Sequence, residues 1–172
     1  MPAHPSRPIA PILGRLVLVA CLILLPNAFA ADSSALPRIN SKEIQALLAK
    51  NKGKVVLLHF WATWCAPCTV EFPALVNLYG GYKARGLEVV AVSLNDFSET
   101  QAVMRFVRAQ NPAFPLFIAG TVEDTFYRSV DQRWSSGVPL SLIYDKTGKL
   151  RYFHDGARTF TQFEQDIQSL LR

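Results

Sequence analysis

Cysteine is scarce in this chain of 172 residues. Only three cysteines occur, at positions 21, 65 and 68, and Cys65 and Cys68 form the one Cys-x-x-Cys pair. A closed structural zinc site needs four ligands, which a single pair does not supply. The sequence therefore gives no reason to expect a structural zinc site.

Clusters of like charge are also missing. The formal net charge is +5, and only 18% of the residues are charged, whereas 50% are hydrophobic. No basic run and no alternation of basic with aromatic residues occurs, so nucleic acid is not an expected partner. Without a repeat or a low-complexity tract, the composition indicates one packed domain with an extension.

A hydrophobic run long enough to cross a membrane is absent as well. The longest one, residues 16–25, is about half of what a spanning helix needs. It follows Arg7 and Arg15 and precedes Ala28-Phe29-Ala30, which is typical of a cleavable secretory signal. We therefore expect a signal peptide over residues 1–30, a tether over 31–40, a domain over 41–172, and export to the periplasm or extracytoplasmic face.

Two alternatives remain for this N-terminal segment. It could stay uncleaved as a membrane anchor. Alternatively, Leu18-Val19-Ala20-Cys21 resembles a bacterial lipoprotein box, in which Cys21 would carry the lipid. Either alternative would tether the domain to a membrane.

The cysteine pair lies between a predicted strand and a predicted helix. Residues 55–61 form a short apolar run rich in β-branched and aromatic side chains, and apolar residues at 72, 75, 76 and 79 follow at helical spacing. Cys65 thus falls near a helix N-terminus, where unpaired N–H groups and the helix dipole favour an anion. We expect its pKa to lie below the roughly 8.5 of a free thiol.

This placement predicts thiol-disulfide exchange. Cys65 would be the attacking thiolate and Cys68 the resolving thiol, while Pro67 stiffens the loop between them. A structural disulfide across two residues would constrain little of the unfolded chain. Two inert buried thiols are the other alternative. A peroxidase is not favoured, because no Pro-x-x-x-Thr-x-x-Cys pattern precedes either cysteine.

The remaining chain alternates strand and helix patterns. Expected helices are one capped by Asn40 with Glu43, one capped by Ser98, one over residues 121–130, and one with a Thr161–Glu164 capping box. Expected strands are residues 87–94, a short segment at 114–118, and a hairpin of 140–145 and 150–154 around the turn 146–149. Gly80-Gly81 marks a break or the end of the helix after Cys68. This order indicates an α/β sandwich with a mixed sheet.

Two landmarks resemble TlpA/ResA-type thioredoxin-like proteins. The first is residues 60–73, and the second is Gly137-Val138-Pro139 followed by residues 142–149; the similarity extends over Lys42–Leu171. The resemblance implies a thioredoxin-like fold, with a central mixed β-sheet flanked by helices on both faces. It also implies an exported bacterial thiol-disulfide oxidoreductase with no cofactor beyond a redox-active Cys65–Cys68 disulfide.

The resemblance also implies roles for individual residues. Cys65 would be the nucleophile, Cys68 the resolver, and Pro139 a cis-proline whose loop pairs with an extended substrate. Val138 would contact the sulfurs, Pro73 would kink the active-site helix, and Glu71 would exchange protons with the cysteines. Substrate contacts are expected from Trp64, Ala66 and Pro67, whereas Trp61 is expected in the core.

Two positions depart from the family pattern. His59 stands where thioredoxin has a buried aspartate; it could support proton transfer, lower the thiol pKa if charged, or be a neutral core residue. Leu140 follows Pro139 where many relatives carry threonine or glutamate. The acidic residue expected of the cytochrome-maturation branch is therefore absent.

The leading hypothesis is a reductase of client proteins with cysteine pairs, of the cytochrome c or copper-site maturation type, recharged by a membrane thiol reductant. One alternative is an oxidant that introduces disulfides, since Ala66-Pro67 does not decide the direction. Another is a copper-handling binding module using the two cysteines and a histidine. A monomer is expected.

Overall fold

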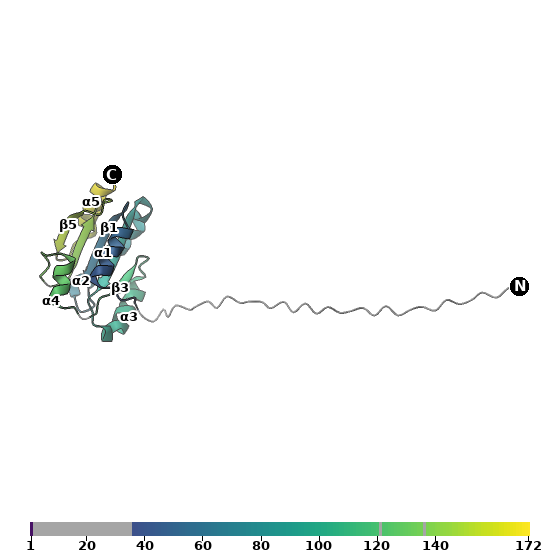
Figure 1. The fold of residues 1–172 in the computed structure, drawn as a ribbon, viewed down its shortest axis with the longest axis horizontal. Helices are drawn as coiled ribbons and strands as arrows, with labels where there is room; N and C mark the ends of the chain where they lie inside the picture. The colour runs from purple at the N-terminus through teal and green to yellow at the C-terminus, as the bar shows by residue number, and fades with distance from the viewer. Residues whose placement is uncertain (2–35, 121, 136) are drawn as a thin grey trace. The chain divides into compact units, whose positions relative to one another are not determined.

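The computed structural model describes Met1 and residues 36–120, 122–135 and 137–172 (Figure 1). The predicted signal peptide beyond Met1, residues 31–35 of the predicted tether, and Thr121 lie outside the described residues. The helices are α1 Ser41–Lys50, α2 Ala66–Tyr82, α3 Thr100–Gln110, α4 Asp124–Val130 and α5 Phe160–Leu171. The strands are β1 Val55–Trp61, β2 Leu87–Ser93, β3 Leu116–Ile118, β4 Leu140–Tyr144 and β5 Leu150–Asp155.

The five strands form one mixed sheet in the order β3-β2-β1-β4-β5. Strands β1, β2 and β3 pair in parallel, whereas β4 is antiparallel to both β1 and β5. All residues of β1 and β2 are buried. Continuous burial is what a central strand covered on both faces requires, and it explains why these two strands have no polar face.

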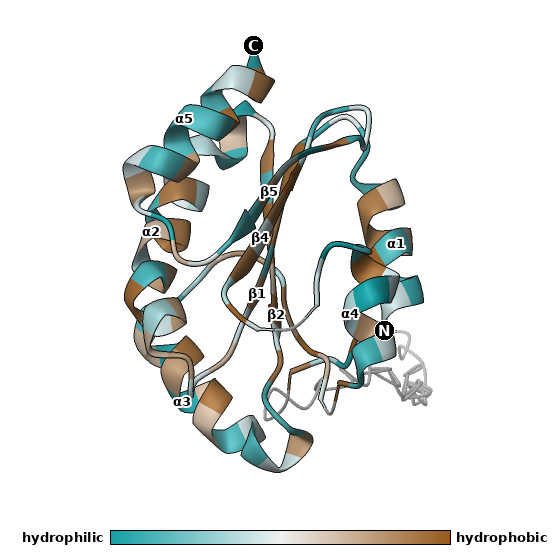
Figure 2. Ribbon diagram, turned by 90° about the vertical axis from the view of Figure 1, so that its left-hand side faces the viewer, coloured by the Kyte–Doolittle hydropathy of each residue, from teal (hydrophilic) through white to brown (hydrophobic). Residues whose placement is uncertain are grey.

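Helices cover both faces of this sheet, and Figure 2 shows it edge-on between α2, α3 and α5 on one side and α1 and α4 on the other. Alternate residues of β1 point to opposite faces. Val55, Leu57 and Trp61 join the core under α2, α3 and α5, whereas Val56, Leu58 and Phe60 join the core under α1 and α4. The thioredoxin-like α/β architecture expected from the sequence is confirmed.

The end of the predicted tether is paired with the sheet. Arg38 forms a parallel bridge with Ile118, and Ile39 donates its N–H to the Ile118 carbonyl at 3.1 Å. The side chain of Ile39 is buried. Within the described residues, no helix combines the length and the apolar character needed to span a membrane.

Two predicted helix caps are wrong. Asp96, not Ser98, caps the helical segment before α3, because its carboxylate accepts the Ser98 N–H at 2.9 Å. Thr159, with Gln162, forms the capping box of α5 in place of Thr161 with Glu164. In both places an earlier side chain with the same capping chemistry lies at the chain reversal. The Asn40–Glu43 capping box of α1 is confirmed.

Helix α2 continues through its helix-disfavouring residues. It contains Pro73 and ends at Tyr82, one residue after Gly80-Gly81, so the glycines do not break the helix and lie in its last turn. The buried side chains of Leu78, Tyr79 and Tyr82 secure its last turns against the core. This packing offsets the roughly 1 kcal/mol by which each glycine disfavours a helix relative to alanine.

Candidate active site

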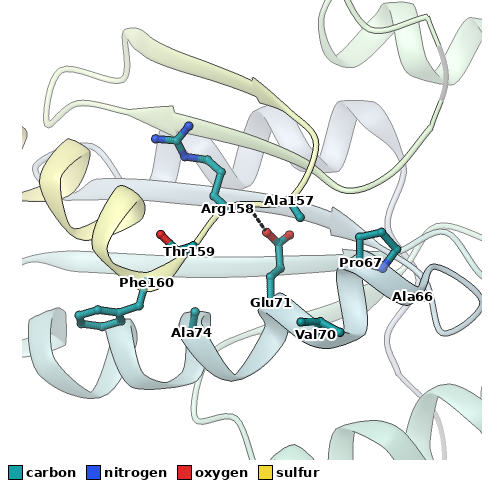
Figure 3. A pocket seen from close by; sticks show the side chains of 9 residues that line it. All are labelled: Ala66, Pro67, Val70, Glu71, Ala74, Ala157, Arg158, Thr159 and Phe160. Atoms are coloured by element: carbon teal, nitrogen blue, oxygen red, sulfur yellow. Dashed lines mark hydrogen bonds between the residues drawn. The ribbon is translucent and has the colours of Figure 1, made fainter.

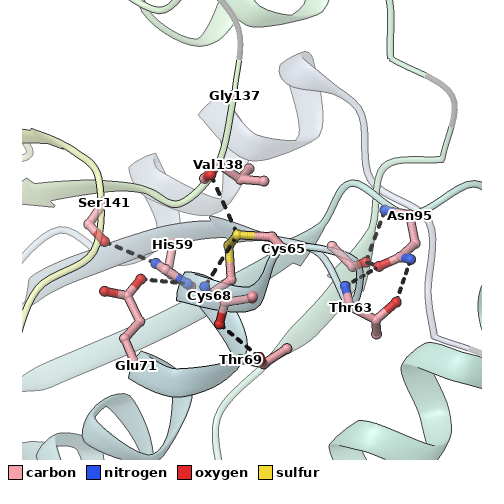
Figure 4. Close-up of a disulfide and its surroundings, with 12 residues drawn as sticks. His59, Thr63, Cys65, Cys68, Thr69, Glu71, Asn95, Gly137, Val138 and Ser141 are labelled. Atoms are coloured by element: carbon pink, nitrogen blue, oxygen red, sulfur yellow. Dashed lines mark hydrogen bonds and ion pairs between the residues drawn. A yellow bond between two sulfur atoms is a disulfide. The ribbon is translucent and has the colours of Figure 1, made fainter.

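Cys65 and Cys68 lie where β1 passes into α2, and their sulfurs are joined (Figure 4). Cys65 is the N-cap of α2, and its Sγ accepts the backbone N–H of Cys68 at 3.2 Å. An N–H donor and the helix dipole both stabilise negative charge on that sulfur. Cys65 is 6% exposed and Cys68 is fully buried, so Cys65 is the sulfur that a partner reaches first.

The loop before β4 lies against this sulfur. The Val138–Pro139 peptide bond is cis, as the resemblance implies. The Val138 carbonyl oxygen is 3.5 Å from the Sγ of Cys65, so the predicted contact of Val138 with the sulfurs is present. Trp134, which the sequence analysis did not single out, donates its indole N–H to the Gly137 carbonyl at 2.9 Å and secures the loop.

The two tryptophans beside the cysteines have opposite environments. Trp61 is fully buried, and its ring centroid lies 4.8 Å from that of Phe72, which confirms its predicted place in the core. Trp64 is 60% exposed, although it is a large apolar side chain. Ala66 and Pro67 are exposed next to it. The three residues expected to contact substrate are thus accessible.

Asn95 fixes the loop that leads into Cys65, and the sequence analysis missed it. This fully buried residue follows β2; its Oδ1 accepts the Thr63 N–H, and its Nδ2 donates to the Thr63 hydroxyl at 2.8 Å. The hydroxyl of Ser93 also donates to Oδ1. Residues 63 and 95 are distant in sequence, so only the parallel pairing of β1 with β2 brings them together.

Glu71 is buried on α2, one turn after Cys68. Its Oε2 accepts the backbone N–H of Arg158 at 2.6 Å. Burial raises the pKa of Glu71 to about 7, although the Arg158 hydrogen bond and charge act in the opposite direction. Glu71 is therefore not an ordinary solvated helix carboxylate. No sequence pattern pointed to Arg158, because its hydrogen bond to Glu71 comes from its backbone N–H.

His59 is fully buried on β1 between Glu71 and Ser141 (Figure 4). Its Nδ1 is 2.9 Å from the Ser141 hydroxyl, and its Nε2 is 3.5 Å from Oε1 of Glu71. Burial lowers the pKa of His59 to about 3, so the ring is neutral at neutral pH. A charged His59 that lowers the thiol pKa is therefore not supported.

A pocket of about 630 Å³ opens beside the cysteine pair (Figure 3). Helix α2 contributes one wall through Ala66, Pro67, Val70, Glu71 and Ala74, and residues 157–160 contribute the other. Val70 is 80% exposed at this pocket. Among the residues that the structure describes, no group of three or more His, Cys, Asp or Glu side chains is arranged to hold a metal ion.

Comparison with known proteins agrees with this geometry. The family model described as "AhpC/TSA family" matches residues 29–153. The thiol-disulfide oxidoreductase ResA of Bacillus subtilis (strain 168) is 34% identical over 142 residues, which cover 83% of this chain and 74% of that protein. ResA of Bacillus anthracis is 37% identical over 120 residues, which cover 69% of this chain and 65% of that protein. The chain thus spans between about two thirds and three quarters of the length of these relatives.

Solved structures show the same fold. A thiol:disulfide interchange protein of the thioredoxin family from Chlorobium tepidum TLS superposes with a TM-score of 0.62 at 24% identity, covering 72% of this chain and 84% of that one. StoA from Bacillus subtilis superposes with a TM-score of 0.53 at 27% identity, covering 68% and 84%. The chain belongs to the AhpC/TSA family, and within it to the thioredoxin-like thiol-disulfide oxidoreductases.

Proposed function

We propose that this protein is an exported reductase that opens disulfides in client proteins with the Cys65–Cys68 dithiol. The observation that carries the proposal is the placement of Cys65. Its sulfur is the N-cap of α2, accepts the Cys68 N–H, and lies 3.5 Å from the carbonyl of the cis-proline loop. A thiolate stabilised in this way attacks, and an extended client backbone beside Val138 would present its disulfide to it.

The reaction has two exchange steps. In the first, the Cys65 thiolate forms a bond to one client sulfur while the client S–S bond breaks, and the released client thiolate takes up a proton. In the second, Cys68 loses its proton and attacks the Cys65 sulfur. The Cys65–Cys68 disulfide forms, the client leaves with two thiols, and two electrons have passed to it.

Glu71 is the base that we assign to the second step. It lies one turn after Cys68 on the same helix, and its side chain is only 3% exposed. A pKa of about 7 suits a group that must both take and return a proton at neutral pH. Trp64, Ala66 and Pro67 would contact the client around the attacked sulfur.

The natural client and the electron donor are proposed from the resemblance. Clients would carry cysteine pairs, of the cytochrome c or copper-site maturation type, and a membrane thiol reductant would restore the dithiol. Leu140 next to the cis-proline weakens the cytochrome assignment. Export is supported by the predicted signal peptide, and the protein would act as a monomer.

The reduction potential of the cysteine pair tests the direction. We expect a value near or below about −220 mV for the purified protein equilibrated in defined thiol buffers. A value near −120 mV would overturn the reductase proposal and make the protein a disulfide donor. If no redox transition occurred, the copper-handling alternative would become the leading one, and titration with copper(I) of wild type and Cys65→Ser would follow.

A further inference from the structure

The buried surroundings of Glu71 contain a histidine that the reaction above does not use. The register of β1 with β4 places His59 opposite Ser141, and the two side chains meet at 2.9 Å. On the other side of the ring, Nε2 and Oε1 of Glu71 face each other at 3.5 Å. Within the described structure, neither of these two atoms has a hydrogen-bond partner.

The neutral ring of His59 carries one proton, on either Nδ1 or Nε2. A proton on Nδ1 would leave a nitrogen lone pair directed at a carboxylate oxygen in a buried site, which is repulsive. A proton on Nε2 directs an N–H at that oxygen. The Ser141 hydroxyl can then donate to Nδ1. When Glu71 is ionised, a proton on Nε2 of His59 is therefore the only position that suits both Ser141 and Glu71.

We propose that Ser141 and His59 are positioning residues that keep Glu71 a competent proton acceptor: Ser141 donates to Nδ1, and the Nε2–H thereby faces Oε1. The carboxylate then meets one N–H at each oxygen, from His59 on β1 and from the Arg158 backbone before α5. This inference rests on the proposed function, because it is the cysteine chemistry that gives Glu71 a proton to accept.

The other groups around the pair do not replace this N–H. Arg158 acts on Glu71 through its backbone N–H and its charge, and its guanidinium donates to Asp166 of α5 at 3.0 Å. Cys68 lies one turn earlier on the same helix and is held in the disulfide. On β2 the residue paired with His59 is Ala91, which does not titrate. Desolvation raises the pKa of Glu71, and N–H groups directed at the carboxylate lower it. Removal of the His59 N–H would therefore raise the pKa of Glu71.

The first test is the protonation site of His59 in the oxidised wild-type protein. Nitrogen NMR of the histidine-labelled, purified protein at about pH 9, where Glu71 with its pKa of about 7 is ionised, should show a proton on Nε2 and none on Nδ1 of His59. A proton on Nδ1, or a doubly protonated ring, would overturn the proposal. This measurement needs no variant and hence cannot fail because a variant does not fold.

The second test is the pKa of Glu71, read from the carbon NMR shift of its labelled carboxyl group. In His59→Leu it should rise by about one pH unit or more, and Ser141→Ala should raise it in the same direction. His59→Gln can again direct an N–H at Oε1, and Ser141→Thr keeps the hydroxyl, so both should stay closer to wild type. An unchanged pKa in both His59→Leu and Ser141→Ala would refute the assignment.

Both readouts use the oxidised protein without client or reductant. Their outcome is therefore independent of the reduction potential of the cysteine pair. A potential typical of a disulfide donor would overturn the proposed reductase direction and leave the His59 assignment intact. Conversely, an Nδ1-protonated His59 in a protein of low potential would remove this inference alone.

Discussion

His59 and Glu71 shift their pKa values in opposite directions on burial, because desolvation disfavours the charged form of each. The pKa of Glu71 rises from 4.5 to about 7, so between these values the folded protein holds more protons than the unfolded chain. Stability then falls as pH rises through this window. The pKa of His59 falls from 6.5 to about 3, so across that window stability rises with pH.

The two effects overlap between pH 4.5 and 6.5, where they oppose each other. We predict that Glu71→Gln exposes the His59 contribution, so that its free energy of unfolding rises relative to wild type as pH increases from about 4.5 to 7. Urea titrations of the oxidised proteins across about pH 3–8 measure this difference. Glu123→Gln, an exposed carboxylate whose side chain forms no cap hydrogen bond, is the control and should follow wild type. A constant difference between Glu71→Gln and wild type would contradict the assigned shift.

The two cysteines differ in access, which predicts different behaviour of their serine variants. Cys65 is the less buried sulfur and Cys68 is fully buried. Cys68→Ser should therefore accumulate a mixed disulfide between Cys65 and a client disulfide, because resolution is blocked. Cys65→Ser should form none. Non-reducing electrophoresis with mass spectrometry of the linked peptides measures both; an adduct through Cys68 in Cys65→Ser would show that the roles are reversed.

The exposed ring of Trp64 should contribute to client contact and not to redox stability. It is 60% exposed and belongs to no core cluster, so Trp64→Ala should leave the reduction potential unchanged. The reaction of the Trp64→Ala variant with a disulfide-bonded peptide client should be about tenfold slower than that of wild type. This corresponds to roughly 1.4 kcal/mol of lost binding free energy in the transition state. Stopped-flow measurement of the fluorescence of the remaining tryptophans, Trp61 and Trp134, compares the rates with the peptide and with a small disulfide. Equal slowing with both substrates would exclude a role of Trp64 in client contact.

Between elements, the loop from β1 to α2 is held by a side chain that follows β2. Asn95 is fully buried and satisfies both the N–H and the hydroxyl of Thr63. It therefore couples the position of Cys65 to the parallel pair of strands rather than to local sequence.

We predict that Asn95→Ala lowers the free energy of unfolding by about 1–3 kcal/mol, because the Thr63 N–H loses its acceptor inside the protein. Chemical denaturation of the oxidised protein measures the loss. Asn77→Ala, at an exposed position of α2, is the matched control and should change stability by less than about 0.5 kcal/mol. Equal effects of the two substitutions would show that the Thr63 contacts contribute nothing.

At the scale of the whole chain, the predicted export signal determines where the mature protein should begin. Cleavage after Ala30 would leave residues 31–172, and Pro37 and Ile39 would remain to pair with Ile118 of β3. We predict that protein recovered from the extracytoplasmic fraction of a bacterial host begins at Ala31. Intact-mass spectrometry decides it: a lipid-modified Cys21 or a retained Met1 would instead mean a membrane-tethered domain.

The architecture and the reactive pair follow from local sequence patterns. Val55–Trp61 and Leu87–Ser93 are apolar nearly throughout, as buried parallel strands must be, and the order of strands and helices permits few sheets. Cys65 at a strand-to-helix junction could be predicted, because a short-range pattern defines that junction. The exposed Trp64 and the cis-proline were expected only through the resemblance to a family.

The environment of Glu71 and His59, by contrast, depends on tertiary contacts. From the sequence alone, a glutamate near the N-terminus of a helix is expected to be solvated. A histidine in an apolar strand is expected to be a neutral core residue whose hydrogen bonds are satisfied. The chain reversal before α5 buries Glu71, and the pairing of β1 with β4 gives His59 its serine. Desolvation and hydrogen bonding act over a few ångströms between segments 12 to 87 residues apart, so no local pattern encodes them.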